Sequence, residues 1–205
     1  MDVQGADDPV RSVDDEQRVD LVFLHQPCRL DGERVGTDGA RRAGHHPVDG
    51  GVAQVDGRLY FDSNGLELKA FHVHDGQGLV LLRKFGIAVA LVTARNSPIA
   101  ERRAAELGVE AWTCVADKLA CVRGIAERHG VAMDQVAFMG DDLPDLRVQA
   151  EVGLAVAPVD AHDWVRERAH WRTHARGGHG AARELCDLLL SVQGHVDSIL
   201  AGTPR

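Results

Sequence analysis

The chain has 205 residues, of which 44% are hydrophobic, 26% are charged and 4% are aromatic. This composition is near the globular average, which excludes a wholly disordered chain and predicts a core built mainly of Ala, Val and Leu. The net charge of −8, from 23 Lys and Arg against 31 Asp and Glu, argues against a nucleic-acid surface as the main function.

The sequence also indicates where the protein works. No apolar run approaches the roughly 18 residues of a membrane helix, and the acidic N-terminus lacks the basic-then-apolar pattern of a secretion signal. The four cysteines show neither CxxC spacing nor a disulfide-rich pattern. We therefore expect a soluble, reduced, cytoplasmic protein with neither a nucleic-acid nor a membrane partner.

Residues 1–55 carry little periodic hydrophobicity. Their one apolar run, Asp20–Leu24, could form a strand, but the polar and glycine-rich sequence around it cannot bury enough surface to offset the entropy of ordering. We expect an atypical segment that is disordered or comes from a shifted reading frame. A folded domain is predicted over residues 56–194, followed by a C-terminal tail over residues 195–205.

Regular strand and helix patterns begin at residue 57 and continue to residue 192. Two short apolar runs flank the tetrapeptide 62–65, whose Asn-Gly ending is typical of a β-hairpin. The run at 87–92 is apolar throughout, which predicts a strand buried on both faces of a parallel sheet. The expected strands lie at 58–61, 66–71, 87–92, 109–115, 136–139 and 153–157, and the expected helices lie at 77–85, 98–107, 118–129, 161–169 and 182–192, with a further segment at 144–151.

Local residues mark several helix ends. Asp75 is the expected N-cap of the first helix, and Gly86 lies past its end. Ser97 and Pro98 open the second helix, and Gly108 closes it. Because strands and helices alternate along the chain, we predict an α/β fold with a doubly wound parallel sheet and helices on both of its faces.

Polar residues gather directly after the expected strands. A parallel sheet binds ligands beyond the carboxyl ends of its strands, and residues 93–97, Asp117 with Lys118, and residues 140–145 all fall there. One crevice then collects hydroxyl groups, two cations and several carboxylates. Mg²⁺ prefers one or two carboxylates plus phosphate oxygens, and Thr, Lys and Arg side chains suit a phosphoryl group. The simpler alternative is a solvated Gly-Asp-Asp turn beside a strand that ends in Thr93.

Six sequence motifs follow one another in a fixed order: GRLYFDSNGLELKAFHVHDGQG at 57–78, LVTARNS at 91–97, DK at 117–118, GDDLPDL at 140–146, GLAVAPVDA at 153–161 and GGHGAARE at 177–184. Together they resemble the 3-deoxy-D-manno-octulosonate 8-phosphate phosphatases, which are small members of the haloacid dehalogenase superfamily. The resemblance implies a haloacid dehalogenase-like fold with a β-hairpin insertion and no large cap domain. It also implies Mg²⁺-dependent hydrolysis of a phosphate monoester on an eight-carbon sugar acid, a step in lipopolysaccharide synthesis.

The resemblance further implies a role for each residue of the site. Thr93 would hydrogen-bond the phosphoryl oxygens, and Lys118 would neutralise the pair formed by the nucleophile and the phosphate. Asp141 and Asp49 would bind Mg²⁺, and Asp49 would also act as general acid and base. The residues expected around these four are Asp142 and Asp145, which would steady the metal ligand, and Arg95, Asn96, Ser97 and His74, which would lie near the carboxylate or the hydroxyls of the substrate.

The resemblance also implies a homotetramer. Residues 58–71 would then lie between subunits, and residues 177–183 would reach a neighbouring active site; the simpler alternative for 177–183 is a flexible glycine-rich loop before a helix. His72 and His74 are expected on one face of a strand, where a zinc site can be imagined, although no third ligand lies at a helpful spacing.

The first catalytic motif departs from the family pattern. A family member has a strand that ends in Asp-Val-Asp-Gly-Val-Leu-Thr-Asp-Gly, whereas residues 46–57 read HPVDGGVAQVDG. Pro47 stands where the nucleophile belongs, two residues are extra, and no apolar strand precedes them. Because proline has no carboxylate to attack phosphorus, covalent catalysis by the family route fails.

Two explanations stay open for this departure. One is a genuine loss, which leaves a non-catalytic phosphate-binding or assembly subunit on the same fold. The other is a reading-frame or sequence error upstream of Gly57, which the surviving motif fragments favour. In either case the sheet would lack its central strand, so we expect Val89 and Val136 to be poorly covered.

Overall fold

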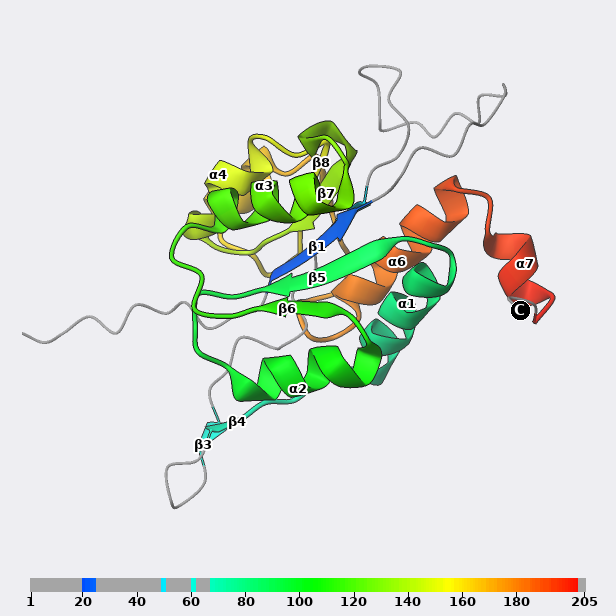
Figure 1. The fold of residues 1–205 in the computed structure, drawn as a ribbon, viewed down its shortest axis with the longest axis horizontal. Helices are drawn as coiled ribbons and strands as arrows, with labels where there is room; N and C mark the ends of the chain where they lie inside the picture. The colour runs from blue at the N-terminus through cyan, green and yellow to red at the C-terminus, as the bar shows by residue number, and fades with distance from the viewer. Residues whose placement is uncertain (1–19, 25–48, 51–59, 62–66, 203–205) are drawn as a thin grey trace, which may run out of the picture.

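The computed structural model describes residues 20–24, 49–50, 60–61 and 67–202 (Figure 1). The strands are β1 (Asp20–Leu24), β2 (Asp49–Gly50), β3 (Tyr60–Phe61), β4 (Glu67–Leu68), β5 (Ala88–Val92), β6 (Glu110–Trp112), β7 (Val136–Met139), β8 (Leu154–Ala157) and β9 (Trp171–Arg172). The helices are α1 (Val73–Lys84), α2 (Pro98–Leu107), α3 (Lys118–His129), α4 (Leu146–Gln149), α5 (Asp163–Arg168), α6 (Ala181–Val192) and α7 (Val196–Leu200), and 3₁₀ helices lie at Met133–Gln135 and Leu143–Asp145.

A seven-stranded sheet forms the middle layer, in the order β6-β5-β1-β7-β8-β9, with β2 beside β7. One hydrophobic cluster joins α1, α2 and α6 to one face of this sheet, and a second joins α3 and α4 to the other face. Figure 1 shows these two helical layers on opposite sides of the strands. The predicted α/β architecture with helices on both faces is therefore confirmed. Within the described part of the chain, no helix is long and apolar enough to span a membrane.

The centre of the sheet differs from the prediction, because β1 is not parallel to its neighbours. It lies between β5 and β7 and pairs antiparallel with both, whereas β5–β6, β7–β8 and β8–β9 are parallel pairs. The expected gap is also absent: Val89 and Val136 are buried opposite Phe23 and Leu24. Strands of either direction can pair with the buried N–H and C=O groups of β5 and β7, so a short apolar segment fills the slot without matching their direction.

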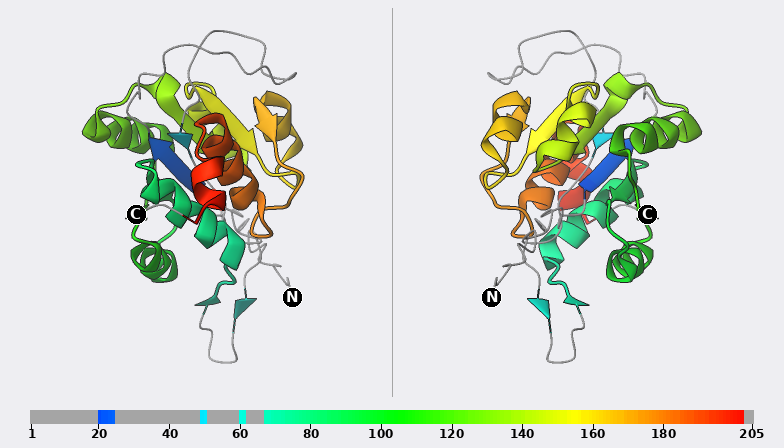
Figure 2. Two further views of the ribbon diagram at one scale, coloured as in Figure 1. Left: turned by 90° about the vertical axis from the view of Figure 1, so that its right-hand side faces the viewer. Right: turned by 90° about the vertical axis from the view of Figure 1, so that its left-hand side faces the viewer.

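The two short strands β3 and β4 form a separate antiparallel pair, with Tyr60 opposite Leu68 and Phe61 opposite Glu67. They occupy the positions predicted for the arms of a hairpin, and the predicted turn at 62–65 lies outside the described residues. Figure 2 shows this pair standing away from the main sheet.

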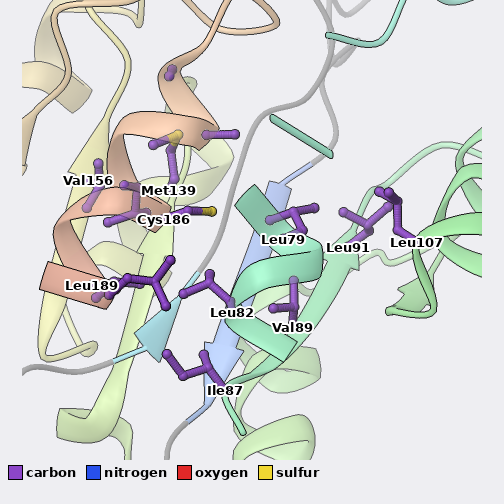
Figure 3. Close-up of a cluster of buried hydrophobic side chains, with 14 of the residues drawn as sticks. Leu79, Leu82, Ile87, Val89, Leu91, Leu107, Met139, Val156, Cys186 and Leu189 are labelled. Atoms are coloured by element: carbon purple, nitrogen blue, oxygen red, sulfur yellow. The ribbon is translucent and has the colours of Figure 1, made fainter. Parts of the chain in front are cut away.

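The larger hydrophobic cluster depends on a close approach of α1 and α6. Figure 3 shows Leu79 and Leu82 of α1 in one cluster with Leu189 of α6, and all three side chains are buried. A Cβ atom on Gly78 would lie 2.9 Å from the Cβ and Sγ atoms of Cys186, so only glycine permits this approach. In the segment expected to be a tail, α7 adds Ile199 to the same cluster.

Two of the predicted helix ends are formed by the expected residues. Ser97 Oγ accepts a hydrogen bond from the N–H of Ala100, with Pro98 in the first turn, and Gly108 closes α2 in the left-handed conformation. The first helix differs, because it begins at Val73 rather than at residue 77 and has no side-chain cap. Asp75 is therefore not its N-cap.

Asp75 instead caps a helix that begins more than a hundred residues later. Its side chain is fully buried in the first turn of α1, where Oδ2 accepts from the N–H of Gly180 at 3.2 Å and Oδ1 from the N–H of Arg183 at 2.8 Å. Gly180 is the N-terminal flank of α6 and has no side chain of its own to accept these bonds. A carboxylate from α1 thus satisfies the first turn of α6.

The burial of Asp75 predicts a specific pH dependence of stability. Burial raises the pKa of this carboxyl above its usual value of 3.8, and the N–H groups of Arg183 and Gly180 oppose that shift. The contribution of Asp75 to the unfolding free energy is complete while the pH is below the pKa that this carboxyl has in the unfolded chain. It is lost as the pH rises through the higher pKa of the folded protein. We predict that, as pH rises through this range, the unchanged chain loses unfolding free energy relative to the Asp75→Asn variant.

Denaturant titrations at successive pH values measure this difference. The matched control is Asp187→Asn, which removes an exposed carboxylate on α6 that pairs with the side chain of Arg183. A difference that stays constant with pH for Asp75→Asn would contradict the prediction.

Candidate active site

The carboxyl ends of β5 and β7 meet at one edge of the sheet. Both strands run antiparallel to β1, so they run parallel to each other. Residues 93–97 follow β5, and residues 140–145 follow β7. Asp117 and Lys118 lie at the start of α3, after β6, which is parallel to β5. The structure therefore brings the three predicted polar segments to the same edge, despite the unexpected direction of β1.

The central contact of this edge is an ion pair between Lys118 and Asp145. Lys118 Nζ donates to Asp145 Oδ1 at 2.7 Å, and the two side chains are only 10% and 1% exposed. The second oxygen, Asp145 Oδ2, accepts from the backbone N–H of Asp141 at 2.9 Å and of Asp142 at 3.1 Å. One carboxylate thus fixes both the lysine and the backbone that carries Asp141.

A glycine makes this arrangement possible. A Cβ atom on Gly140 would lie 2.5 Å from the Cβ and Cγ atoms of Asp145, so no other residue fits without moving the carboxylate. The carbonyl of Gly140 accepts from Gln149 Nε2 at 3.4 Å, and the carbonyl of Asp141 accepts from the N–H of His162 at 2.8 Å. The strand end that carries Asp141 is therefore held from two sides.

The aspartates after β7 have different surroundings. Asp141 is buried at the edge. Asp142 is half-buried, and its Oδ1 accepts from the N–H of Leu143 at 2.8 Å, so it caps the 3₁₀ helix Leu143–Asp145. The structure thus places Asp145, rather than the side chain of Asp142, directly behind the backbone of Asp141.

Thr93 is held in the segment after β5. Its side chain is buried, and Oγ1 accepts from the N–H of Arg95 at 3.3 Å. The backbone of Thr93 bonds to Trp112 and Val115, and the carbonyl of Arg95 accepts from the N–H of Cys114. These bonds join the segments that follow β5 and β6, which fixes the hydroxyl near the edge that holds Lys118.

Ser97 and its neighbours occupy several environments. Asn96 is exposed and Arg95 is half-buried. Ser97 is buried, caps α2, and also accepts a hydrogen bond from Lys69 Nζ at 3.1 Å. The sequence prediction missed Lys69, because a lone lysine in an expected hairpin strand carries no local signal of a site. The structure brings it to the segment after β5 from a position 28 residues earlier.

His72 and His74 do not lie on a strand, contrary to the sequence prediction. His72 flanks α1 and His74 is exposed in its first turn, with ring centroids 5.1 Å apart. Among the residues that the structure describes, no three His, Cys, Asp or Glu side chains gather into a metal-binding group. Within the described part of the chain, the ring of His74 contacts the ring of His72 rather than the residues around Lys118.

Asp49 lies away from this edge. In β2 it pairs with Val136, the first residue of β7, whereas Asp141 follows the last residue of that strand. At about 3.3 Å per residue, the backbone of Asp49 is level with a point about 10 Å before the end of β7. The acid–base and metal roles of Asp49 therefore stay predictions, and Pro47 lies outside the described residues.

A cavity of about 450 Å³ opens beside Lys118. Its lining comes from the segments after β5 and β6, the start of α3, and the region from Pro144 to α4; the residues are Ala94, Cys114, Val115, Ala116, Asp117, Lys118, Leu119, Pro144 and Arg147. Arg147 was not predicted as a site residue. Its Nη1 donates to Asp117 Oδ2 at 3.4 Å across the rim.

The side chains at this edge can supply one protein ligand to Mg²⁺. Mg²⁺ binds through one or two carboxylates and takes its other ligands from water and phosphate oxygens. Asp141 offers a buried carboxylate at the strand end, whereas both oxygens of Asp145 already accept hydrogen bonds. The described residues therefore suit a cation held by Asp141, with its remaining positions available to water and phosphate.

Comparison with known proteins places the chain among phosphatases. It is 44% identical to the 3-deoxy-D-manno-octulosonate 8-phosphate phosphatase of Salmonella typhi over 151 residues, which cover 73% of this chain and 79% of that protein. No family model matches the sequence.

Solved structures agree with this relationship. A hypothetical protein of Xanthomonas campestris is 53% identical, with a TM-score of 0.72, over 74% of this chain and 84% of that one. The 3-deoxy-D-manno-octulosonate 8-phosphate phosphatase of Moraxella catarrhalis, in complex with magnesium, phosphate and a KDO molecule, is 37% identical, with a TM-score of 0.71, over 76% of this chain and 89% of that one. The chain therefore belongs to the 3-deoxy-D-manno-octulosonate 8-phosphate phosphatase family of the haloacid dehalogenase superfamily.

Proposed function

We propose that this chain is a Mg²⁺-dependent phosphatase that hydrolyses 3-deoxy-D-manno-octulosonate 8-phosphate to the free sugar acid and phosphate, in lipopolysaccharide synthesis. The observation that carries the proposal is the buried contact of Lys118 with Asp145, which also holds the backbone of Asp141. The Moraxella catarrhalis relative, which holds magnesium, phosphate and KDO together, supports the same three ligands here.

The residues at the edge have complementary tasks in this proposal. Lys118 neutralises negative charge on the phosphoryl group, and its ammonium is kept in place by Asp145. Thr93 donates its hydroxyl proton to a phosphoryl oxygen, because its own oxygen already accepts from the N–H of Arg95. Asp141 would hold Mg²⁺, which supplies positive charge to the phosphoryl oxygens when bound.

The first catalytic motif does not supply the usual nucleophile. Pro47 occupies the position of the attacking aspartate, so hydrolysis requires another carboxylate, for which Asp49 is the candidate. The register of Asp49 against the start of β7 favours a second function, in which the chain binds phosphate without turnover and acts as an assembly subunit.

We also propose a cytoplasmic homotetramer formed through residues 58–71 and 177–183. The β3–β4 pair stands away from the sheet, where a second subunit could contact it (Figure 2). The N–H of Gly177 donates to Asp160 Oδ1 at 2.9 Å, and the N–H of Gly180 donates to Asp75. These bonds hold the glycine-rich segment that leads into α6, which supports a defined contact rather than a flexible loop.

The first prediction concerns activity of the unchanged chain. We expect Mg²⁺-dependent phosphate release from 3-deoxy-D-manno-octulosonate 8-phosphate, and we expect Asp141→Asn to abolish it, because the amide is a weaker ligand for a hard cation. A malachite-green phosphate assay with and without Mg²⁺ measures both. Phosphate binding without release would overturn hydrolysis and leave the non-catalytic function in place.

A second prediction tests the function of the described edge independently of the first catalytic motif. We expect that replacing residues 1–57 by the matching segment of the Salmonella typhi phosphatase raises turnover by orders of magnitude, because a nucleophile then meets an intact Lys118. The same replacement with Lys118→Ala is expected to lose that gain. No gain in a folded replacement protein would mean that the described edge is itself defective.

A third prediction concerns the glycine behind the ion pair. Gly140→Ala is expected to lower the unfolding free energy by about 1–3 kcal/mol and to weaken phosphate binding, because the added methyl displaces Asp145. Gly124→Ala is the control, since a Cβ there meets no atom within 4 Å and the helix gains about 1 kcal/mol. Thermal melts and phosphate titrations compare the two variants, and equal effects would contradict the prediction.

A further inference from the structure

We infer that Arg147 recognises the carboxylate of the substrate and thereby sets the preference of the site for a sugar acid. The inference rests on the proposed function, because it assigns the phosphate end of the substrate to Lys118. It assigns the opposite end of the same molecule to the cavity that opens beside that lysine.

The cavity has two cationic side chains in its lining, Lys118 and Arg147. Lys118 is nearly buried and bound to Asp145, so its position is fixed at the phosphoryl end. Arg147 extends from α4 and lines the same cavity, as Pro144 does. Arg95, which the sequence predicted for the substrate carboxylate, is not among the lining residues, although its neighbour Ala94 is.

Arg147 is held loosely enough to take a ligand. Its side chain is 68% exposed, and its contact with Asp117 is a single 3.4 Å bond from Nη1. Exposed pairs of this kind contribute little to stability, so a ligand carboxylate can share or replace the contact at small cost. The guanidinium has five N–H donors, and the contact with Asp117 uses one of them.

Asp117 keeps Arg147 beside the cavity. Its Oδ1 accepts from the N–H of Ala120 at 3.1 Å, so the carboxylate is anchored as the N-cap of α3. This hydrogen bond, followed by the charge of Arg147, lowers the pKa of Asp117 and keeps it ionised. Arg147 is therefore oriented by a fixed anion that is the direct neighbour of Lys118 in the chain.

The cavity lining has two cationic side chains, and the proposed substrate has two anionic groups. It carries a phosphate at one end and a carboxylate at the other, and the cavity volume of about 450 Å³ lies in the range of small-ligand pockets. A planar guanidinium can bind a carboxylate through two parallel N–H bonds, which a lysine cannot do. With phosphate at Lys118, Arg147 is the lining cation left for the carboxylate.

Calorimetry on the full chain with Mg²⁺ tests the inference without requiring turnover. The two probes are 3-deoxy-D-manno-octulosonate, which has the carboxylate but no phosphate, and inorganic phosphate. For Arg147→Gln we expect roughly tenfold weaker binding of the sugar acid and less than about twofold change for phosphate, as for the loss of one charge-assisted contact. Arg147→Lys should recover part of the affinity, because it restores the positive charge but not the two parallel N–H bonds of a guanidinium.

The matched control is Arg123→Gln. Arg123 also links α3 to the end of α4, through Glu151 at 2.6 Å, but it does not line the cavity. An equal loss in the control, or unchanged sugar-acid affinity in Arg147→Gln, would overturn the inference while the proposed function stands. An unchanged chain that binds neither probe would overturn both. Circular dichroism of each variant shows whether it is folded, and Arg147→Lys provides the comparison if Arg147→Gln is not.

Discussion

The site depends on a single carboxylate that makes three hydrogen bonds. Asp145 holds the ammonium of Lys118 with one oxygen and the backbone of Asp141 and Asp142 with the other. Its position in turn requires that residue 140 have no side chain. Because these groups are nearly buried, loss of any one partner leaves a charge or an N–H group unpaired in a poorly hydrated place. The cation and the metal ligand are thus positioned by the same group.

The central slot of the sheet is filled by a strand that runs antiparallel to both of its neighbours. The sequence resemblance predicts a central parallel strand that ends in the first catalytic motif. Here Asp20–Leu24 fills the slot in the opposite direction and buries Val22. Backbone pairing and apolar burial do not depend on strand direction, whereas a catalytic side chain must lie at the carboxyl end. The slot therefore supports the core whichever direction its strand takes.

Local signals made much of the fold predictable. The span of α3 and the cap Ser97 follow from residues within a few positions of each helix end, and the structure has them as predicted. The polar segments at the edge could also be placed, since they directly follow apolar strands. By contrast, the direction of β1, the contact of Lys69 with Ser97 and the place of Arg147 in the cavity depend on segments distant in sequence. A single sequence carries no pattern for such contacts.

The capping of α6 by Asp75 has a consequence for how the chain is made. During synthesis α1 leaves the ribosome long before Gly180 and Arg183, whose N–H groups are the partners of this buried carboxylate. Until they arrive, packing α1 in its final place would bury an ion with no hydrogen-bond donor, which is costly. The nascent domain must therefore keep the first turn of α1 hydrated until Gly180 and Arg183 have been synthesised. A ribosome that stalls before residue 180 would hold a chain whose larger hydrophobic cluster stays open to chaperones and proteases.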